Sequence, residues 1–256
     1  MNEKGTIRLD LAVSNKLFIS RTIAQDIIEK GEVKVDGKVV TKSGIKIDKM
    51  NEIEVESNLQ SFVSRGGFKL QAAIKEFNLD LNGLICMDVG ASSGGFSDCM
   101  IQNGAKKVYA IDSGTDQLKD ELRKNPAIVS IEKMDIRKLD PTAFEKIDFV
   151  SVDVSFISLE KILGHVYSFM SDKSSAVFLV KPQFEAGIGA TNKKGVVKNP
   201  KIHCKVIDKV YNYAKEVGFV CHGHIESPIK GGDGNVEFLM YVVKEPEKHE
   251  DYWLDS

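Results

Sequence analysis

The sequence is poor in cysteine and tryptophan and contains no long apolar run. Its four cysteines lack the paired spacing of metal sites or disulfide frameworks, so we predict no metal site. No apolar run approaches the roughly 20 residues that a membrane helix needs. The N-terminal residues are charged and lack the apolar segment of a secretory signal. We therefore expect a cytoplasmic protein with no stable membrane association.

An excess of charge of either sign is also missing. The chain has 35 lysine and arginine residues against 37 aspartate and glutamate residues, a net charge of −2. Any surface for nucleic acid must then be a local patch. With 42% hydrophobic and 28% charged residues, the composition is typical of a soluble globular protein. The length of 256 residues allows one large domain and one small one.

A glycine-rich segment, DVGASSGG at residues 88–95, closes an apolar strand-like run and opens a helix. Glycine has no Cβ, so a ligand can lie against the backbone there. The first turn of the helix also offers unpaired N–H groups to a polar ligand. Asp112 ends the next strand-like run, where a carboxylate can hold ribose hydroxyls. The segment therefore indicates a cofactor that contains a nucleoside.

The spacing of the glycines distinguishes between such cofactors. Dinucleotide sites follow G-x-G-x-x-G, whereas this chain has G-x-x-x-G-G, which fits a pyrophosphate poorly. S-adenosylmethionine has no phosphate and is the better candidate. Asp135, after a third strand-like run, is in place to accept a hydrogen bond from the adenine amine. The predicted cofactor-binding residues are Asp88, Gly90, Ala91, Ser92, Gly94, Gly95, Phe96, Asp112, Asp135 and Asp153.

The N-terminal part of the chain forms a separate small module. Helices are predicted over residues 9–15 and 21–30, followed by a strand, an Asp36-Gly37 turn and a second strand. This unit is too small to carry a catalytic cleft. Its acids match its bases in number, so ordinary surface charge is the alternative to an RNA-binding strip. The predicted RNA-binding residues are Arg8, Lys16, Arg21, Lys30, Lys34, Lys38 and, from the following segment, Arg65.

Three short stretches in this module carry a resemblance. RLD at residues 8–10, SRTIAQ at 20–25 and KGEVKVDGK at 30–38 occur in the order found in the small RNA-binding domain named after ribosomal protein S4, which the module resembles. The resemblance implies binding of structured RNA through its backbone and shape.

Strands and helices alternate in the rest of the chain. Strand-like runs occur at residues 84–89, 107–111, 128–131, 149–152 and 176–180. Helical segments are predicted at residues 67–77, 95–103, 116–124, 159–170 and 201–217. Two last strands, at 219–225 and 236–243, are joined without a helix and should form an antiparallel edge. We predict an α/β, Rossmann-like methyltransferase fold with a seven-stranded, mostly parallel sheet.

The domain boundaries follow from these elements and from a polar stretch near residue 60. We predict an RNA-binding domain at residues 1–58, a linker at 59–64, a methyltransferase domain at 65–245 and a loose C-terminal tail at 246–256.

Charged residues gather at the predicted carboxyl edge of the sheet. Asp153 and Lys181 end two strands, Lys69 lies in the first turn of a helix, and Glu237 lies on the last strand. A lysine between an apolar run and a proline, as at Lys181, must place its ammonium at the edge of the cleft. Each residue alone is compatible with an exposed charge at the end of an element. Together they indicate a catalytic site.

The resemblance to known families extends to this part of the chain. SRGGFKL at 64–70, DVSFIS at 153–158 and KPQFE at 181–185 resemble the FtsJ-type ribosomal RNA 2′-O-methyltransferases. Together with the N-terminal module, residues 6–244 resemble the TlyA family, long labelled hemolysin A. The resemblance implies S-adenosylmethionine as cofactor and ribosomal RNA within ribosomal subunits as partner, with cytidine as the methylated nucleotide. It also implies a catalytic tetrad formed by Lys69, Asp153, Lys181 and Glu237.

The reaction requires a ribose hydroxyl to be aligned, dehydrated and deprotonated. Lys181 is the predicted residue at this hydroxyl. A neutral Lys181 can take the proton, with Lys69 lowering its pKa by like-charge repulsion. A charged Lys181 can instead stabilise the forming alkoxide. The loop over residues 185–200 suits an RNA clamp or a simple solvated loop.

Other activities fit the residues less well. Methylation of a base nitrogen usually uses two prolines after the fourth strand, and the segment DVSF at 153–156 has none. Methylation of pyrimidine carbon 5 needs a suitably placed cysteine, but Cys86 lies inside a strand and Cys204 inside a helix. An assembly factor without methyl transfer is disfavoured by the intact tetrad. A membrane-active hemolysin is disfavoured by the lack of a spanning or amphipathic basic helix.

Overall fold

The computed structural model describes residues 5–17, 21–56, 62–187, 189–231 and 234–246. The chain divides into two compact units, Met1–Phe62 and Val63–Ser256. Most of the predicted linker and tail lies outside the described residues. No helix in the described part of the chain is both long enough and apolar enough to cross a membrane.

The N-terminal unit packs two helices against short strands. Leu9, Val13, Ala24, Ile27 and Ile28 form its buried core together with residues from the strands. A three-stranded sheet has the order β3-β2-β5, and β1 pairs antiparallel with β4. Its elements are β1 (Thr6–Arg8), α1 (Leu9–Leu17), α2 (Arg21–Glu29), β2 (Val33–Val35), β3 (Lys38–Val39), β4 (Lys46–Asp48) and β5 (Ile53–Val55). The predicted helices and hairpin are present, whereas β1, β4 and β5 were not predicted; unlike β2 and β3, they are not joined by a recognisable Asp-Gly turn.

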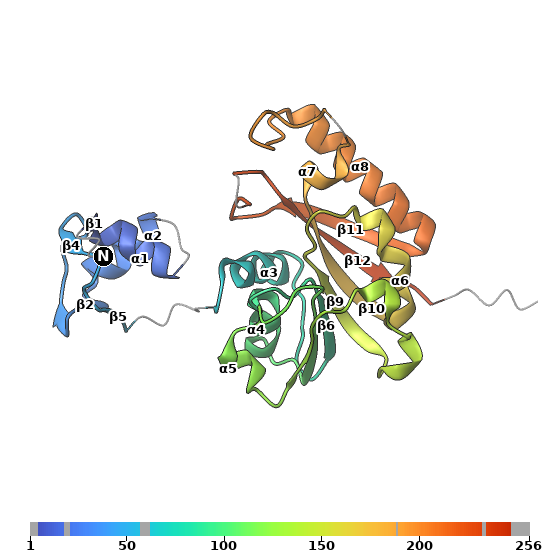
Figure 1. Ribbon diagram of the computed structural model, residues 1–256, viewed down its shortest axis with the longest axis horizontal. Helices are drawn as coiled ribbons and strands as arrows, with labels where there is room; N and C mark the ends of the chain where they lie inside the picture. The colour runs from blue at the N-terminus through green and yellow to red at the C-terminus, as the bar shows by residue number, and fades with distance from the viewer. Residues whose placement is uncertain (1–4, 18–20, 57–61, 188, 232–233, 247–256) are drawn as a thin grey trace, which may run out of the picture. The chain divides into compact units, whose positions relative to one another are not determined.

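The C-terminal unit is built on a seven-stranded sheet of order β11-β12-β10-β9-β6-β7-β8 (Figure 1). Strands β10, β9, β6, β7 and β8 pair in parallel, and β12 pairs antiparallel with both β10 and β11. The strands are β6 (Ile85–Val89), β7 (Lys107–Ile111), β8 (Ile128–Ile131), β9 (Ile147–Val152), β10 (Met170–Val180), β11 (Phe219–Glu226) and β12 (Phe238–Lys244). This arrangement confirms the predicted fold class and its antiparallel edge.

Helices cover both faces of this sheet. Helices α3 and α4 pack together on one side, and α6 and α8 lie on the other (Figure 1). The helices are α3 (Arg65–Glu76), α4 (Gly95–Gln102), α5 (Asp120–Arg123), α6 (Leu163–Phe169), α7 (Pro182–Glu185) and α8 (Pro200–Val217), with short 3₁₀ turns η1 (Ile136–Lys138), η2 (Pro141–Ala143) and η3 (Leu159–Lys161). The central strands are mostly apolar on both sides, as a sheet covered on both faces requires, and Asp88 and Ser151 are buried polar exceptions.

Two predicted helices are shorter than the sequence pattern suggests. The helix predicted at 116–124 begins only at Asp120. Before it, the carboxylate of Glu132 accepts hydrogen bonds from the backbone N–H groups of Asp116, Gln117 and Leu118. A carboxylate from the neighbouring strand therefore takes the donors that a first helical turn would present. The helix predicted at 159–170 is interrupted at Ile162, which separates η3 from α6.

Candidate functional site

Two cavities open at the carboxyl edge of the sheet, where the order of the parallel strands reverses between β6 and β9. We call the first, of about 360 Å³, the catalytic cavity because all four predicted catalytic residues line it. We call the second, of about 600 Å³, the nucleoside cavity. Their shared wall is formed by Gly90, Ser92, Asp153, Ser155 and Phe156. The two cavities therefore adjoin each other along these residues.

The four predicted catalytic side chains form two buried or half-buried ion pairs. Lys69 Nζ from α3 lies 2.5 Å from Glu237 Oε2, which is just ahead of β12. Lys181 Nζ at the end of β10 lies 2.6 Å from Asp153 Oδ1 at the end of β9. Burial of a charge without such a partner is strongly unfavourable. Each ammonium is thus held in the cavity wall by its own carboxylate.

Further contacts fix the position of each pair. Lys181 also donates to Ser155 Oγ at 2.9 Å. The backbone at Gly231 lies so close to Glu237 that an added Cβ would stand 2.5 Å from Glu237 Oε1. Glycine at this position lets the turn before β12 pack directly on the carboxylate. The geometry of the Lys69–Glu237 pair therefore depends on Gly231, a residue without a side chain.

The nucleoside cavity has a carboxylate on one wall. Asp112 accepts hydrogen bonds from the backbone N–H groups of Ser92 and Gly114, each at 2.7 Å. Gly90 has a φ of +88°, and a Cβ there would stand 2.3 Å from the carbonyl oxygen of Asp153. Ile111, Ile136, Val154 and Ile162 supply apolar lining. An oriented carboxylate, bare backbone and apolar walls fit a nucleoside without phosphate.

Comparison with known proteins agrees with this geometry. Residues 62–244 match the FtsJ-like methyltransferase family, and residues 7–53 match the S4 domain. Hemolysin A of Brachyspira hyodysenteriae is 40% identical over 93% of this chain and 100% of its own. The 16S/23S rRNA (cytidine-2′-O)-methyltransferase TlyA of Mycobacterium tuberculosis is 35% identical over 92% of this chain and 89% of its own.

A solved Streptococcus thermophilus structure, whose title also carries the hemolysin name, is 40% identical with a TM-score of 0.71. It covers 94% of this chain and 89% of its own. The chain belongs to the TlyA family. As an FtsJ-like methyltransferase of this family, it uses S-adenosylmethionine as the methyl donor.

Asp88 has a different place in this TlyA family member from the one the sequence suggests. It is completely buried and lines neither cavity. Ser97 Oγ and Ser151 Oγ donate to its carboxyl group at 2.7 and 3.0 Å. Gly94 also lies away from both cavities, because it faces Leu118 and Leu122. The other predicted cofactor residues line one cavity or both: Gly90, Ala91, Ser92, Gly95, Phe96, Asp112, Asp135 and Asp153.

Burial of Asp88 makes stability depend on pH. Loss of solvation raises the pKa of this carboxyl group to about 7, from an ordinary 3.8. Between these values the folded protein holds a proton that the unfolded chain has released, so this contribution to stability is lost as the pH rises. Asp88→Asn cannot ionise. We therefore expect the unfolding free energy of the variant minus that of the parent to rise by on the order of a few kcal/mol between pH ~5 and pH ~8. Urea unfolding at both pH values measures this, and parallel pH profiles would contradict it.

Asp135 lines the nucleoside cavity but is already engaged by a cation. Arg137 Nη2 lies 2.5 Å from Asp135 Oδ2, and Arg137 Nε lies 3.0 Å from Oδ1. These bonds hold the pKa of Asp135 at about 2. A hydrogen bond from an adenine amine must therefore share this carboxylate with Arg137.

Most predicted RNA-binding residues of the TlyA-family chain make polar contacts within the N-terminal unit. Lys30 pairs with Asp26, Lys34 with Glu56, and Lys16 donates to the carbonyl of Ile53. Arg8 and Arg21 both bind Asp10, while Lys38 is exposed. Arg65 belongs instead to the C-terminal unit, where it begins α3 and lines the catalytic cavity.

Two site residues were missed by the sequence analysis. Phe156 has a φ of +64° and is 91% exposed, and its ring lies 5.1 Å from the ring of Phe184. Both rings line the catalytic cavity. A non-glycine residue with positive φ is uncommon and marks a place where the surrounding structure imposes the conformation. Nothing in the local pattern DVSFIS distinguishes Phe156 from a buried aromatic residue.

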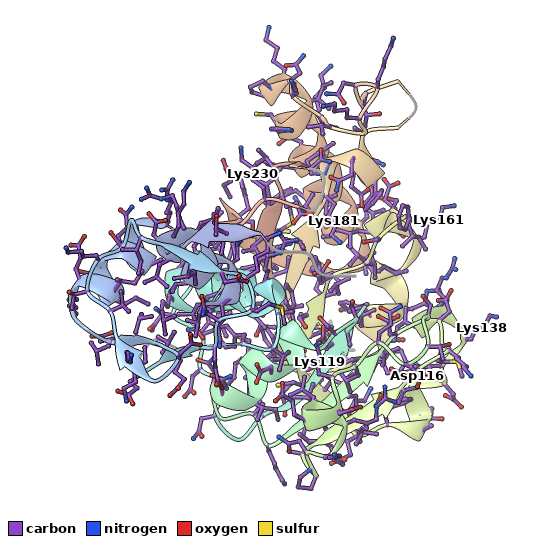
Figure 2. All side chains as sticks on the ribbon, turned by 60° about the vertical axis from the view of Figure 1, so that its left-hand side comes forward. Asp116, Lys119, Lys138, Lys161, Lys181 and Lys230 are labelled. Carbon is purple, nitrogen blue, oxygen red and sulfur yellow. The ribbon has the colours of Figure 1, made fainter. Side chains whose placement is uncertain are left out.

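Several lysines of the C-terminal unit lie on separate segments (Figure 2). Lys119, Lys138, Lys161 and Lys230 are exposed, whereas Lys181 is buried. Lys119, Lys138 and Lys161 follow β7, β8 and β9, and Lys230 lies in the turn ahead of β12. All four thus come from segments at the carboxyl edge of the parallel strands. Among the described residues, no group of His, Cys, Asp or Glu side chains could hold a metal ion.

Proposed function

We propose that this protein transfers a methyl group from S-adenosylmethionine to the 2′-hydroxyl of a cytidine in ribosomal RNA. The observation that carries the proposal is the Lys181–Asp153 pair, whose carboxylate belongs to the wall shared by both cavities. With the donor in the nucleoside cavity, an acceptor oxygen beside Lys181 faces the boundary between them. The TlyA relatives that are named cytidine-2′-O-methyltransferases support the same target.

The side chains of the pair suit a hydroxyl that loses its proton. A lysine ammonium has three N–H donors, and Lys181 directs one to Asp153 and one to Ser155. The third is available for the 2′-oxygen, where it stabilises the negative charge that grows as the O–H bond breaks and the proton passes to the carboxylate of Asp153. When bound, S-adenosylmethionine supplies an electrophilic methyl group on a sulfonium. The protein aligns the attacking oxygen with that methyl group and excludes water.

The Lys69–Glu237 pair orients the wall of the catalytic cavity around the acceptor ribose. Lys69 and Glu237 join α3 to the start of β12, across 168 residues of sequence. Their bond holds a second ammonium near Lys181 while Glu237 balances its charge. In this role Lys69 and Glu237 keep the cavity shaped for the ribose and maintain the field around the reacting oxygen.

The aromatic side chains suit an unstacked nucleotide. Single-stranded or extruded bases are commonly held by stacking on aromatic rings. Phe156 presents an almost fully exposed ring at the cavity rim, beside Phe184. The exposed lysines at the carboxyl edge can hold the neighbouring phosphates. The S4 domain supplies a further RNA contact, which supports ribosomal RNA as the partner.

Mass spectrometry of nucleosides tests the proposal. Ribosomal RNA from cells with the gene is compared with RNA from cells that lack it and from cells that carry only a Lys181→Ala copy. We expect 2′-O-methylcytidine at one or more sites to disappear in both altered strains. Loss of a base-methylated nucleoside, or no loss at all, would contradict the proposal. If the Lys181→Ala copy restored methylation, Lys181 would not be needed for the reaction.

A further inference from the structure

Asp10 in the N-terminal unit has an unusual set of partners. Its side chain is completely buried and accepts five hydrogen bonds. Arg8 donates through Nε and Nη2 at 3.1 and 2.8 Å, and Arg21 donates through Nε and Nη2 at 3.0 Å each. Gln25 Nε2 adds a bond at 2.9 Å. One acid thus binds two guanidinium groups from different elements, β1 and α2.

The two arginines remain accessible although Asp10 is not. Their side chains are 44% and 52% exposed, for Arg8 and Arg21. A guanidinium carries five N–H donors, and each arginine directs only two of its nitrogens to Asp10. Within the described part of the chain, the remaining N–H groups of both side chains make no hydrogen bond and are available to a ligand. The cluster carries a net charge of +1, because two cations share one carboxylate.

Other basic residues of the unit lack this arrangement. Lys30 pairs with Asp26 and Lys34 with Glu56, each as a neutral pair with an exposed acid. Such surface pairs are weakly held and screened by salt. Each arginine instead makes two hydrogen bonds to one buried acid, Arg8 to both carboxylate oxygens and Arg21 to Oδ2 alone. These bonds fix the plane of each guanidinium before any ligand arrives.

We propose that Asp10 is a positioning residue that holds Arg8 and Arg21 as one receptor for phosphodiester oxygens of RNA. This inference rests on the proposed RNA-binding role of the N-terminal unit. Arginine binds a phosphate group best when two of its N–H groups donate to two phosphate oxygens in the plane of the guanidinium. Fixing two such forks in advance removes the entropy loss of ordering two long side chains on binding. Asp10 therefore strengthens binding of a polyanion although it is itself an acid.

The proposal makes a prediction opposite in sign to that of simple electrostatics. Asp10→Asn removes a negative charge, so a charge-only account expects equal or tighter RNA binding. We expect the full-length variant to bind labelled total ribosomal RNA about tenfold more weakly, because both arginines lose their anchor. The plot of log affinity against log salt concentration has a negative slope, and the magnitude of this slope should decrease by about one to two. Filter-binding titrations over a salt series measure both quantities.

A matched control comes from the same unit. Asp26→Asn removes the same charge from an exposed acid on α2, and we expect unchanged or slightly tighter binding from it. Weaker binding by Asp10→Asn with no loss from Asp26→Asn supports the proposal. Equal or tighter binding by a folded Asp10→Asn variant overturns it. Absence of RNA binding by the parent protein would instead remove the proposed function on which the inference rests.

Charge-conserving variants decide the matter if Asp10→Asn does not fold. Arg8→Lys and Arg21→Lys keep both positive charges but lose the two-point hydrogen bonding of each guanidinium to Asp10. We expect each to weaken RNA binding at least about threefold while its thermal unfolding stays close to that of the parent. RNA affinities equal to that of the parent in both lysine variants overturn the proposal, since charge alone would then suffice.

Discussion

Replacing Lys181 by alanine is expected to lower the rate of methyl transfer by about 10³-fold. The variant removes the ammonium that contacts Asp153 and Ser155 beside the shared wall of the two cavities. S-adenosylmethionine should still bind within a few-fold of the parent affinity, because Lys181 does not line the nucleoside cavity. Tritium transfer to ribosomal RNA gives the rate, and calorimetry gives the donor affinity.

Lys146→Ala is the matched control for this experiment. It removes the same charge from an exposed lysine just ahead of β9, at the amino end of the parallel strands, and we expect methyl transfer to remain within a few-fold. A Lys181→Ala enzyme that keeps a tenth or more of the parent rate would contradict the assignment. Loss of donor binding in that variant would show instead that the lysine shapes the cofactor site.

Replacing Gly90 by alanine is expected to abolish donor binding and methyl transfer together. Gly90 has a φ of +88°, and a Cβ there would overlap the carbonyl oxygen of Asp153 at 2.3 Å. Relief of this overlap must move either the end of β6 or the strand end that carries Asp153. A displacement of ~1 Å at a reacting centre lowers rates by about 10²-fold. We expect at least this loss of rate and a similar loss of donor affinity.

Gly83→Ala separates strain from overlap. Gly83 has a φ of +76°, but a Cβ there would meet nothing within 4 Å. Both variants carry the conformational strain of about 1–3 kcal/mol for a non-glycine residue with positive φ. Only Gly90→Ala adds the clash. Equal losses of activity in the two variants would show that strain, rather than the approach of Asp153, explains the effect.

Local patterns predicted much of this molecule because they reflect local physical causes. Apolar runs of five or six residues between glycines and charged turns correspond to buried parallel strands, and β6, β7 and β9 lie where these runs predicted. Residues at the ends of such strands must meet at one edge of the sheet. For this reason Asp112, Asp153 and Lys181 could be assigned to that edge without coordinates.

The structure adds what the sequence pattern does not contain where distant segments compete for the same groups. The helix before β8 starts late because Glu132 takes the backbone donors of residues 116–118. Asp88 resembles a cofactor ligand in sequence, but serines from α4 and β9 surround it in the core. Asp135 is already bound by Arg137. A sequence pattern does not contain these partners, since each is chosen by packing.

By itself, the sequence determined the fold class, the alternation of strands and helices in the C-terminal unit and the kind of cofactor, and it singled out four charged residues that line one cavity. These follow from periodicity and from which residues stand at the ends of strands. Only the tertiary structure decided which charges pair. Lys69 finds Glu237, Lys181 finds Asp153, and Asp10 gathers Arg8 and Arg21. A buried charge takes the partner that folding places beside it, whatever their separation along the chain.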